Sequence, residues 1–368
     1  MGLTGLGGLG RGVIYGYIAN LFPETEVTSL CDIDPAVLEY GKMTFGLNDS
    51  DCYRDYDQFV KRPDTDIIFV GTPIEAHAEQ SIKALEAGKH VLSELTAANT
   101  VEGCKRLVHA VKQTGLKYMM AENFRYFHFI QQWIDLVQQG KLGEMVYAEA
   151  DSMDQLKSYL RDPLTGKVAW KARRPPIHYS SHGLGPILSL FDDRVVRAMA
   201  IGNGSEILPD VRPGGIDAQV ALFETSRGKM IKLLRSQVIS RTIIYYSLYG
   251  TQGFLETGRD SEAGIAETTR GLRFIEGEDK EPKHVEWSYV DPEILKLSSD
   301  IPNPDQETRG GIHTTCEYSV FADFLGSILN DTKPPVDVVK ATDWTLPGLI
   351  AYDSSLDSNR WLEVPHFE

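Results

Sequence analysis

Hydrophobic and polar positions alternate between two periods along the first 140 residues. Short apolar runs rich in β-branched residues, such as residues 66–70, are typical of strands buried on both faces. Stretches with helical spacing separate them. The predicted strands are residues 1–4, 26–31, 66–70, 90–95 and 117–121, and the predicted helices are residues 10–21, a helix opening at 34–35, and residues 74–87, 100–114 and 124–139. This alternation predicts a doubly wound parallel sheet covered by helices on both faces.

Residues at the ends of the predicted helices have the expected capping chemistry. Asp34 is a candidate N-cap before Pro35, and Thr100 is another. Gly88 and Gly115 follow predicted helices, where a left-handed residue commonly ends the last turn.

The pattern changes after residue 143. Five segments read as strands with few helices between them, which suggests a largely antiparallel sheet. These strands are residues 144–152, 195–201, 216–223, 229–238 and 243–249, followed by helical patterns at 314–329 and 338–356. Residues 250–304 are rich in charge, Gly and Pro and have no assignment. We predict a first domain over residues 1–123 and a second over 124–368, whose late helices are candidates for packing back on the first domain.

Composition and charge narrow the class of protein. The chain has 368 residues with a net charge of 37 − 52 = −15, which disfavours binding to nucleic acid or to an anionic membrane surface. No apolar run reaches the length of a membrane span, and no signal peptide is evident at the start. The four cysteines have neither metal-ligand nor redox spacing, so we expect buried thiols in a reducing cytoplasm.

A glycine-rich turn after the first predicted strand indicates a dinucleotide site. Gly5, Gly7 and Gly10 form G-x-G-x-x-G, and Gly8 and Leu9 lie in the same turn. Gly5 would allow the tight turn, Gly7 would let backbone N–H groups approach a pyrophosphate, and Gly10 would let the helix pack on the strand.

Asp32 ends the next predicted strand, 22 residues after Gly10, where an acid accepts hydrogen bonds from the adenosine ribose. A 2′-phosphate there would meet like charge from Asp32 and Asp34, and the segment CDIDPAV contains no arginine. The sequence therefore favours NAD over NADP. A doubly wound domain that has lost its cofactor is the structural alternative.

Several motifs resemble the glucose-fructose oxidoreductase / inositol dehydrogenase (Gfo/Idh/MocA) family along essentially the whole chain. They are GLGGLGRG, CDID, VGTPIEAHAEQSIKALEAGKHVLSE, GKLGEMVYAEA and KPPVDVVKATDW. The resemblance implies a Rossmann domain and a C-terminal α/β domain with an open mixed sheet that forms a homo-oligomer interface, in a dimer or tetramer. It also implies a nicotinamide cofactor and a sugar or cyclitol substrate. Thr72, Pro73, His77 and Glu94 then match positions beside the cofactor.

The sequence departs from the family pattern at two places. The usual Glu-Lys-Pro tripeptide reads Glu94-Leu95-Thr96, and the usual D-x-x-x-H pair begins with His178 in place of the aspartate. The segments SELTAA, AENFRYF and YSSHGLGPI instead resemble NAD-dependent glycosidases, notably α-N-acetylgalactosaminidases. That resemblance implies that Tyr179 and His182 supply the catalytic acid/base groups. Histidine titrates closest to neutrality, so His182 is the leading candidate base, whereas Tyr179 would need a lowered pKa.

Other candidate substrate ligands are Glu122, Tyr126, His178 and His313. Glu122 and the candidate cofactor ligand Asn123 follow a predicted parallel strand, where ligands bind; capping of the next helix is the alternative for Asn123. Tyr126 would stack on a sugar or pack between domains, while His178 and His313 would contact substrate or be structural.

His178 and His182 stand four residues apart, a spacing that can hold a metal, but no acid completes the set and no metal is predicted. Lys171, Arg173 and Arg174 form a basic segment. It would be a solvated loop or would attract an anionic sugar.

Three functions fit these observations. The first is an NAD-dependent oxidoreductase that transfers hydride between a sugar carbon and nicotinamide. The second is a glycosidase that uses retained NAD for transient oxidation and elimination. The third is an NAD-binding regulator without chemistry, which the missing lysine and aspartate allow.

Overall fold

The computed structural model describes residues 1–7, 11–155, 160–161, 168–204, 215–257, 272–274, 283–285 and 312–368. It divides into two compact units. One contains residues 1–126, 290–342 and 367–368, and the other contains residues 127–289 and 343–366. Gly8, Leu9 and Gly10 of the glycine-rich turn lie outside the described residues.

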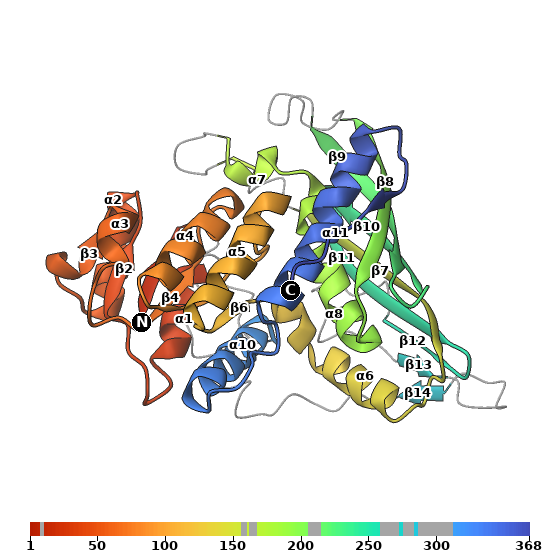
Figure 1. The fold of residues 1–368 in the computed structure, drawn as a ribbon, viewed down its shortest axis with the longest axis horizontal. Coiled ribbons are helices and arrows are strands. Elements are labelled where there is room, and N and C mark those ends of the chain that lie inside the picture. The colour runs from red at the N-terminus through yellow and green to blue at the C-terminus, as the bar shows by residue number, and fades with distance from the viewer. Residues whose placement is uncertain are drawn as a thin grey trace. The chain divides into compact units, whose positions relative to one another are not determined.

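The first unit contains the predicted parallel sheet (Figure 1). Its six strands lie in the order β3-β2-β1-β4-β5-β6, the doubly wound order whose topological switch point lies between β1 and β4. The strands are β1 (Gly2–Thr4), β2 (Ser29–Cys31), β3 (Cys52–Tyr53), β4 (Ile67–Val70), β5 (His90–Ser93) and β6 (Tyr118–Met120). The helices are α1 (Arg11–Ala19), α2 (Pro35–Phe45), α3 (Tyr56–Phe59), α4 (Ile74–Glu86) and α5 (Val101–Thr114), with short 3₁₀ turns η1 (Asp49–Asp51) and η2 (Asn123–Tyr126). The prediction of a Rossmann fold is confirmed.

Local capping chemistry forms as predicted. The Asp34 side chain accepts a hydrogen bond from Ala36 N at the start of α2, and Thr100 accepts one from Gly103 N at the start of α5. Gly115 ends α5 in the left-handed conformation.

The late helix α10 (Ile312–Leu329) packs against α1 in the first unit. Arg11, the first residue of α1, forms an ion pair with the buried Glu317 of α10. Phe22 stacks on Tyr318 of the same helix, with 5.0 Å between the ring centroids. Residues from both ends of the sequence therefore build this unit.

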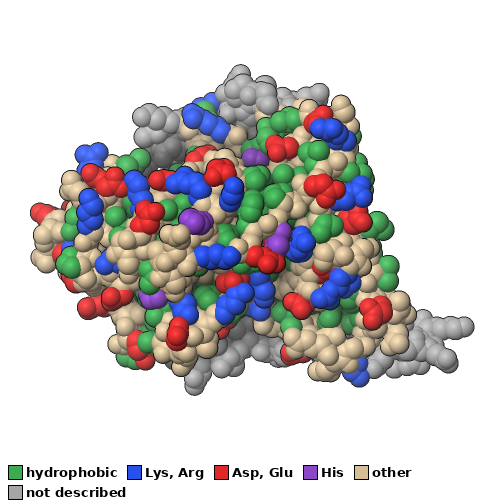
Figure 2. Space-filling model, viewed as in Figure 1, with side chains coloured by type: hydrophobic (Ala, Val, Ile, Leu, Met, Phe, Trp, Pro, Cys, Tyr) green, Lys and Arg blue, Asp and Glu red, His purple; other side chains and the backbone are tan. Residues whose placement is uncertain are grey.

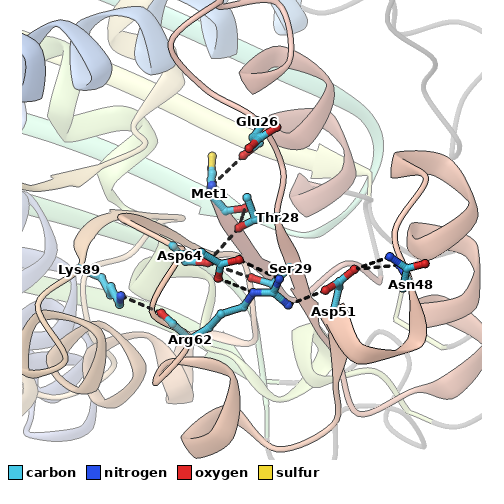
Figure 3. Close-up of polar contacts among 10 residues, drawn as sticks. Met1, Glu26, Thr28, Ser29, Asn48, Asp51, Arg62, Asp64 and Lys89 are labelled. Atoms are coloured by element: carbon cyan, nitrogen blue, oxygen red, sulfur yellow. Dashed lines mark hydrogen bonds and ion pairs between the residues drawn. The ribbon is translucent and has the colours of Figure 1, made fainter.

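Arg62 connects the edge of the parallel sheet to the segment before β4 (Figure 3). Its Nε and Nη2 donate to the two carboxylate oxygens of Asp64 at 2.6 and 2.9 Å, and Nη1 donates to Asp51 at 2.7 Å. Its backbone carbonyl accepts from Lys89 Nζ. The guanidinium holds the pKa of Asp64 below its usual range. The hydrogen bond from the Asn48 backbone, followed by that from Arg62, lowers the pKa of Asp51.

We expect Arg62→Ala to lower the free energy of unfolding by about 1–2 kcal/mol, because a bidentate carboxylate pair and a second ion pair are lost together. Arg106→Ala is the matched control, since Arg106 and Glu79 form a single ion pair with both side chains about half exposed. Loss of the Arg106–Glu79 ion pair should change the free energy of unfolding by less than about 0.5 kcal/mol. Urea unfolding of the three proteins compares them, and equal stabilities would contradict the assigned role of Arg62.

The second unit contains a mixed, mostly antiparallel sheet, as predicted. Its order is β12-β11-β7-β10-β9-β8-β15, and within it only β7 and β10 pair in parallel among the described strands. The strands are β7 (Met145–Gln155), β8 (Val195–Gly204), β9 (Ile216–Thr225), β10 (Met230–Ser236), β11 (Val238–Gly250), β12 (Phe254–Glu256) and β15 (Leu362–Glu363). In the segment left unassigned, β13 (Leu272–Phe274) pairs with β14 (Lys283–Val285).

Helices cover one face of this sheet (Figure 1). They are α8 (Ser181–Phe191) and α11 (Val338–Leu356), and the turn η4 (Pro176–Tyr179) contacts β9 and β10. Helix α6 (His128–Gln138) packs on α8, and α7 (Trp170–Arg173) precedes η4. Ser354 and Ser355 of α11 bond Ala200 N and Gln219 on the covered face. Helix α8 packs on β7, and a Cβ at Gly183 would lie 2.4 Å from Leu233 Cδ1. Glycine at this position therefore allows α8 to approach the sheet closely.

No helix among the described residues has the length and apolarity to cross a bilayer. Figure 2 shows Lys and Arg side chains interspersed with Asp and Glu on the face drawn, with hydrophobic side chains between them.

None of the four cysteines, all within the described part of the chain, forms a disulfide. Cys31, Cys104 and Cys316 are buried as predicted, whereas Cys52 is half-buried.

Candidate functional site

The turn after β1 is pressed against the turn after β4. Gly5 has φ +75°, and a Cβ there would lie 2.4 Å from the carbonyl carbon of Gly71 and 2.5 Å from Thr72 N. Gly71 N donates to Thr4 O at 2.9 Å. Only glycine at position 5 satisfies both the left-handed backbone and this close approach.

Asp32 braces the glycine turn. Its Oδ2 accepts hydrogen bonds from Leu6 N at 2.8 Å and Gly7 N at 3.4 Å, and its Oδ1 accepts from Asp34 N at 3.0 Å. The carboxylate is partly exposed and has acceptor capacity beyond these bonds. Asp32 is therefore held at the end of β2, in the position that the motif predicts.

The described part of the turn fits a dinucleotide. Gly7 is exposed, and a Cβ there would meet no atom closer than Val37 at 3.6 Å, so its backbone is accessible. Two further glycines of α1 allow close packing. A Cβ at Gly12 would lie 2.9 Å from Gly5 O, and a Cβ at Gly16 would lie 2.4 Å from a Phe45 ring carbon. These two contacts were missed in the sequence.

Arg54 is a second residue that the sequence did not indicate. It follows β3 and donates from Nη2 to Ile33 O at 3.1 Å, which places its charge beside the Asp32–Asp34 segment. The segment CDIDPAV contains no arginine, but the fold supplies one from 21 residues further along the chain.

His77 ties two loops of the first unit together. Its Nε2 lies 2.6 Å from Thr72 O and its Nδ1 lies 2.8 Å from Thr96 O. The side chain is buried, and burial lowers its pKa. Because both ring nitrogens face backbone carbonyls, His77 would shape the loops around a cofactor rather than bond to it. Thr72 Oγ1 donates to Gln80, and Pro73 precedes α4.

Glu94 and Glu122 follow neighbouring strands β5 and β6 at their carboxyl ends. Glu94 N donates to Val70 O, and the Leu95–Thr96 peptide bond is cis. Glu122 is fully buried and its Oε1 accepts from Phe124 N at 3.3 Å, so Glu122 bonds the backbone at the start of η2. Asn123 is also buried.

Tyr126 is bound to α10. Its hydroxyl donates to Asp323 Oδ2 at 2.7 Å, and burial, followed by the charge of Asp323, raises its pKa. The hydroxyl of Tyr126 is therefore bonded to a residue of the same compact unit.

Tyr179 and His182 meet in the second unit. Their ring centroids are 4.8 Å apart and the rings are nearly perpendicular. Tyr179 is the last residue of η4 and His182 stands three residues later in the first turn of α8, a spacing that places two side chains on the same helical face. The hydroxyl of Tyr246 on β11 donates to the backbone carbonyl of His182.

Two arginines flank the Tyr179 ring. The guanidinium carbon of Arg174 lies 3.9 Å from the ring centroid, and that of Arg235 lies 5.6 Å from it. Arg174 is 7% exposed and Arg235 is 0% exposed. The expectation of a solvated loop is therefore wrong for Arg174, whose guanidinium packs among the rings of Trp170 and Tyr179.

The two histidines with four-residue spacing contact different neighbours. The His178 ring meets the edge of Tyr352 with 4.8 Å between centroids, whereas His182 meets Tyr179. Burial, and then the charge of Arg174, lower the pKa of His178 to about 4. In the described ranges there is no group of three His, Cys, Asp or Glu side chains suited to a metal ion. The side chain of His313 lies outside the described residues, although its backbone belongs to α10.

Comparisons with known proteins agree with this fold. A model of the "oxidoreductase family, NAD-binding Rossmann fold" matches residues 1–122. A glycosyl hydrolase family 109 protein of Shewanella pealeana is 25% identical over 403 residues, covering 100% of this chain and 85% of that protein.

Two solved structures are similar along their full lengths. The aldose-aldose oxidoreductase of Caulobacter crescentus, complexed with glycerol, has a TM-score of 0.75 at 20% identity, covering 99% of both chains. The scyllo-inositol dehydrogenase of Lactobacillus casei, with bound NAD(H) and scyllo-inositol, has a TM-score of 0.73 at 20% identity, covering 98% of both.

Proposed function

We propose that the chain is a member of the Gfo/Idh/MocA oxidoreductase family, whose model matches residues 1–122, and that it is an NAD-dependent oxidoreductase acting on a sugar or sugar derivative. The reaction is hydride transfer between a hydroxyl-bearing carbon and nicotinamide. The observation that carries this proposal is the turn at Gly5 and Gly7, braced by Asp32 at the switch point of the parallel sheet. The inositol and aldose enzymes with the same fold support a polyhydroxylated substrate.

Residues of the first unit would hold the cofactor. The backbone of the glycine turn would face the pyrophosphate, and Asp32 would accept bonds from the ribose hydroxyls. Thr72 and Pro73 would border the cofactor, while Glu94 and Asn123 would orient the nicotinamide. When bound, nicotinamide supplies the hydride acceptor or donor.

Residues of the second unit would handle the proton. Oxidation of a carbinol requires the hydroxyl proton to leave, and His182 would accept it with Tyr179 assisting. His178 remains neutral near pH 7 because its pKa is about 4, so it would serve as a hydrogen-bonding ligand of the substrate. Glu122, Tyr126 and His313 are further proposed substrate ligands.

A glycosidase is the second candidate, and the name of the full-length Shewanella relative favours it. In that reaction the sugar would be oxidised transiently, a base would remove the carbon 2 proton, the anomeric group would leave, and water and hydride would return. Net NADH would not appear, and solvent deuterium would enter carbon 2.

A panel of sugars and aryl glycosides distinguishes the candidates. The protein is purified, its bound nucleotide is identified, and each compound is assayed for NADH and for released aglycone. NADH without aglycone supports the oxidoreductase, whereas aglycone without net NADH supports the glycosidase. Nucleotide binding without hydride exchange on any compound would favour a non-catalytic regulator.

Removing the acid at position 32 should weaken selectivity for NAD. For Asp32→Ser we expect the Kd for NAD to rise about tenfold, because the ribose loses an acceptor and the turn loses its brace. The Kd for NADP should rise less, since Arg54 then faces a 2′-phosphate without the opposing carboxylate. Asp34→Ser, which retains an N-cap, is the control. Calorimetric titration with both nucleotides measures the effect; equal NAD affinity in Asp32→Ser would refute the assignment.

We also propose a cytoplasmic homo-oligomer, a dimer or tetramer, formed through the open sheet face. Three strands present exposed apolar side chains on that face: Ile201 is 59% exposed, Leu222 is 41% exposed and Met230 is 58% exposed. Surfaces of this kind commonly bind another protein surface. Light scattering coupled to gel filtration tests the proposal, and a monomeric mass would contradict it.

A further inference from the structure

Tyr179 lies in an electropositive environment built by three elements. Arg174 from the segment after α7 covers the ring at 3.9 Å, Arg235 from β10 lies at 5.6 Å, and His182 from α8 meets its edge. The arginines come from positions 61 residues apart, so the fold and not a local motif creates this arrangement.

The charges around Tyr179 do not cancel. Arg235 Nη2 forms an ion pair with Asp154 Oδ2 at 3.0 Å, and Nη1 donates to Ser152 O at 2.8 Å. Arg174 has no carboxylate contact of this kind among the described residues, and its Nε atom is buried there without an acceptor. The charge of Asp154 also raises the pKa of Arg174, so among the described residues two buried arginines face one carboxylate beside the phenol ring.

We propose that Arg174 is a positioning residue that holds the Tyr179 phenol in its ionised form, ready to accept the substrate proton. This inference rests on the proposed function. In oxidation of a carbinol, the O–H bond would break and its proton would bond to the phenolate oxygen. The electron pair of that O–H bond would form the C=O bond, and the C–H bond would break to give the hydride that a bound nicotinamide would accept. Arg174 itself neither gains nor loses a proton.

The physical basis is charge compensation at low dielectric. A cation within about 4–6 Å favours the charged form of an acid, whereas burial favours the neutral phenol; Tyr179 is only half-buried, so the attraction of the two arginines is the larger effect. The effect is visible on the arginine. Burial lowers the pKa of Arg174 to about 10, and the charge of Tyr179 opposes that decrease. Because coupling between two sites is reciprocal, the same attraction favours the phenolate.

The remaining titratable neighbours do not reverse this balance. Asp154 is paired with Arg235, and His178 is neutral near pH 7 because its pKa is about 4. A protonated His182 would add positive charge beside the ring. Tyr179 would therefore assist His182, the base of the proposed function, by taking the proton from the substrate hydroxyl and passing it on to the imidazole.

Tyrosinate absorbance in the near ultraviolet tests, without any substrate, whether Arg174 favours the ionised form of Tyr179. The pH titration of the wild type minus that of Tyr179→Phe isolates the signal of Tyr179. We expect ionisation near neutral pH in the wild type, a shift of at least about one pH unit upward in Arg174→Met, and an intermediate value in Arg174→Lys. Arg173→Met, at the exposed neighbouring arginine, should titrate like the wild type.

Two spectroscopic results would overturn the inference. One is an unshifted Tyr179 signal in Arg174→Met, and the other is a wild-type Tyr179 that ionises only with ordinary tyrosines. Circular dichroism confirms that the variants are folded. If Arg174→Met does not fold, Arg174→Lys carries the test, because its more compact charge cannot stack as a planar guanidinium does.

The catalytic part is tested on the substrate found by the sugar panel. The acid limb of the kcat–pH profile should move upward by about one unit in Arg174→Met, with about tenfold lower kcat at neutral pH and little change in KM. Arg174→Lys should restore part of kcat. An unmoved profile would overturn the catalytic role. A spectroscopic shift without activity on any sugar would instead contradict the proposed function and leave the charge assignment standing.

Discussion

Replacing His182 with alanine is expected to reduce turnover by about 10²–10⁴-fold, the range associated with loss of a general acid–base. The same variant should bind NAD with unchanged affinity, because the turn at Gly5 and Asp32 belongs to the other compact unit. His182 contributes an edge contact to Tyr179, so its removal disturbs both members of the proposed relay.

The measurement pairs kcat on the substrate with NAD titration of the same preparation. His109→Ala is the control, since His109 is an exposed residue of α5. His182→Gln separates packing from proton transfer, because glutamine fills space and forms hydrogen bonds but does not titrate near neutral pH. Near-normal turnover in His182→Ala would exclude His182 as the base.

The parts of the fold predicted from sequence are those with a local physical cause. β-branched runs produce β4, side-chain oxygens at Asp34 and Thr100 begin helices, and Gly115 ends one. The glycine turn and Asp32 are equally local, since both stand at the ends of strands that the pattern identifies. These features need little knowledge of tertiary packing.

The elements that the sequence did not predict depend on tertiary contacts. Helix α8 contains Gly183, Gly185 and Pro186, which are poor helix formers, yet Gly183 is required for its close packing on the sheet. Strand β3 has two residues at the sheet edge and no apolar period to detect. Helix α8 and strand β3 therefore form because of tertiary packing, since the local propensity of their residues does not predict them.

The same division applies to the candidate site. The sequence identified Tyr179 and His182, which are neighbours in the chain. It could not show that Arg235 approaches from β10 or that Arg174 is buried, because a run of basic residues usually indicates a solvated segment. The ionisation of Tyr179 therefore depends on the two arginines that the fold places beside it, and the sequence alone did not indicate them.

Gly5→Ala is expected to abolish detectable NAD binding and to lower the free energy of unfolding by about 3 kcal/mol or more. The new Cβ would lie 2.4 Å from the carbonyl carbon of Gly71 and 2.5 Å from its oxygen, all in backbone that no rotamer change can move. The turns after β1 and β4 must separate, which displaces the amides of Leu6 and Gly7 from Asp32.

Comparison with Gly46→Ala distinguishes the effect of a steric clash from that of left-handed backbone strain. Gly46 has φ +66°, close to the +75° of Gly5, but a Cβ there meets nothing within 4 Å. Its alanine variant should lose only about 1 kcal/mol, the cost of a left-handed conformation for a residue with a Cβ, and should bind NAD normally. Urea unfolding and calorimetric NAD titration compare the two variants. If Gly5→Ala bound NAD as tightly as Gly46→Ala, the turn after β1 could not be the pyrophosphate site, since its amides would have moved without effect.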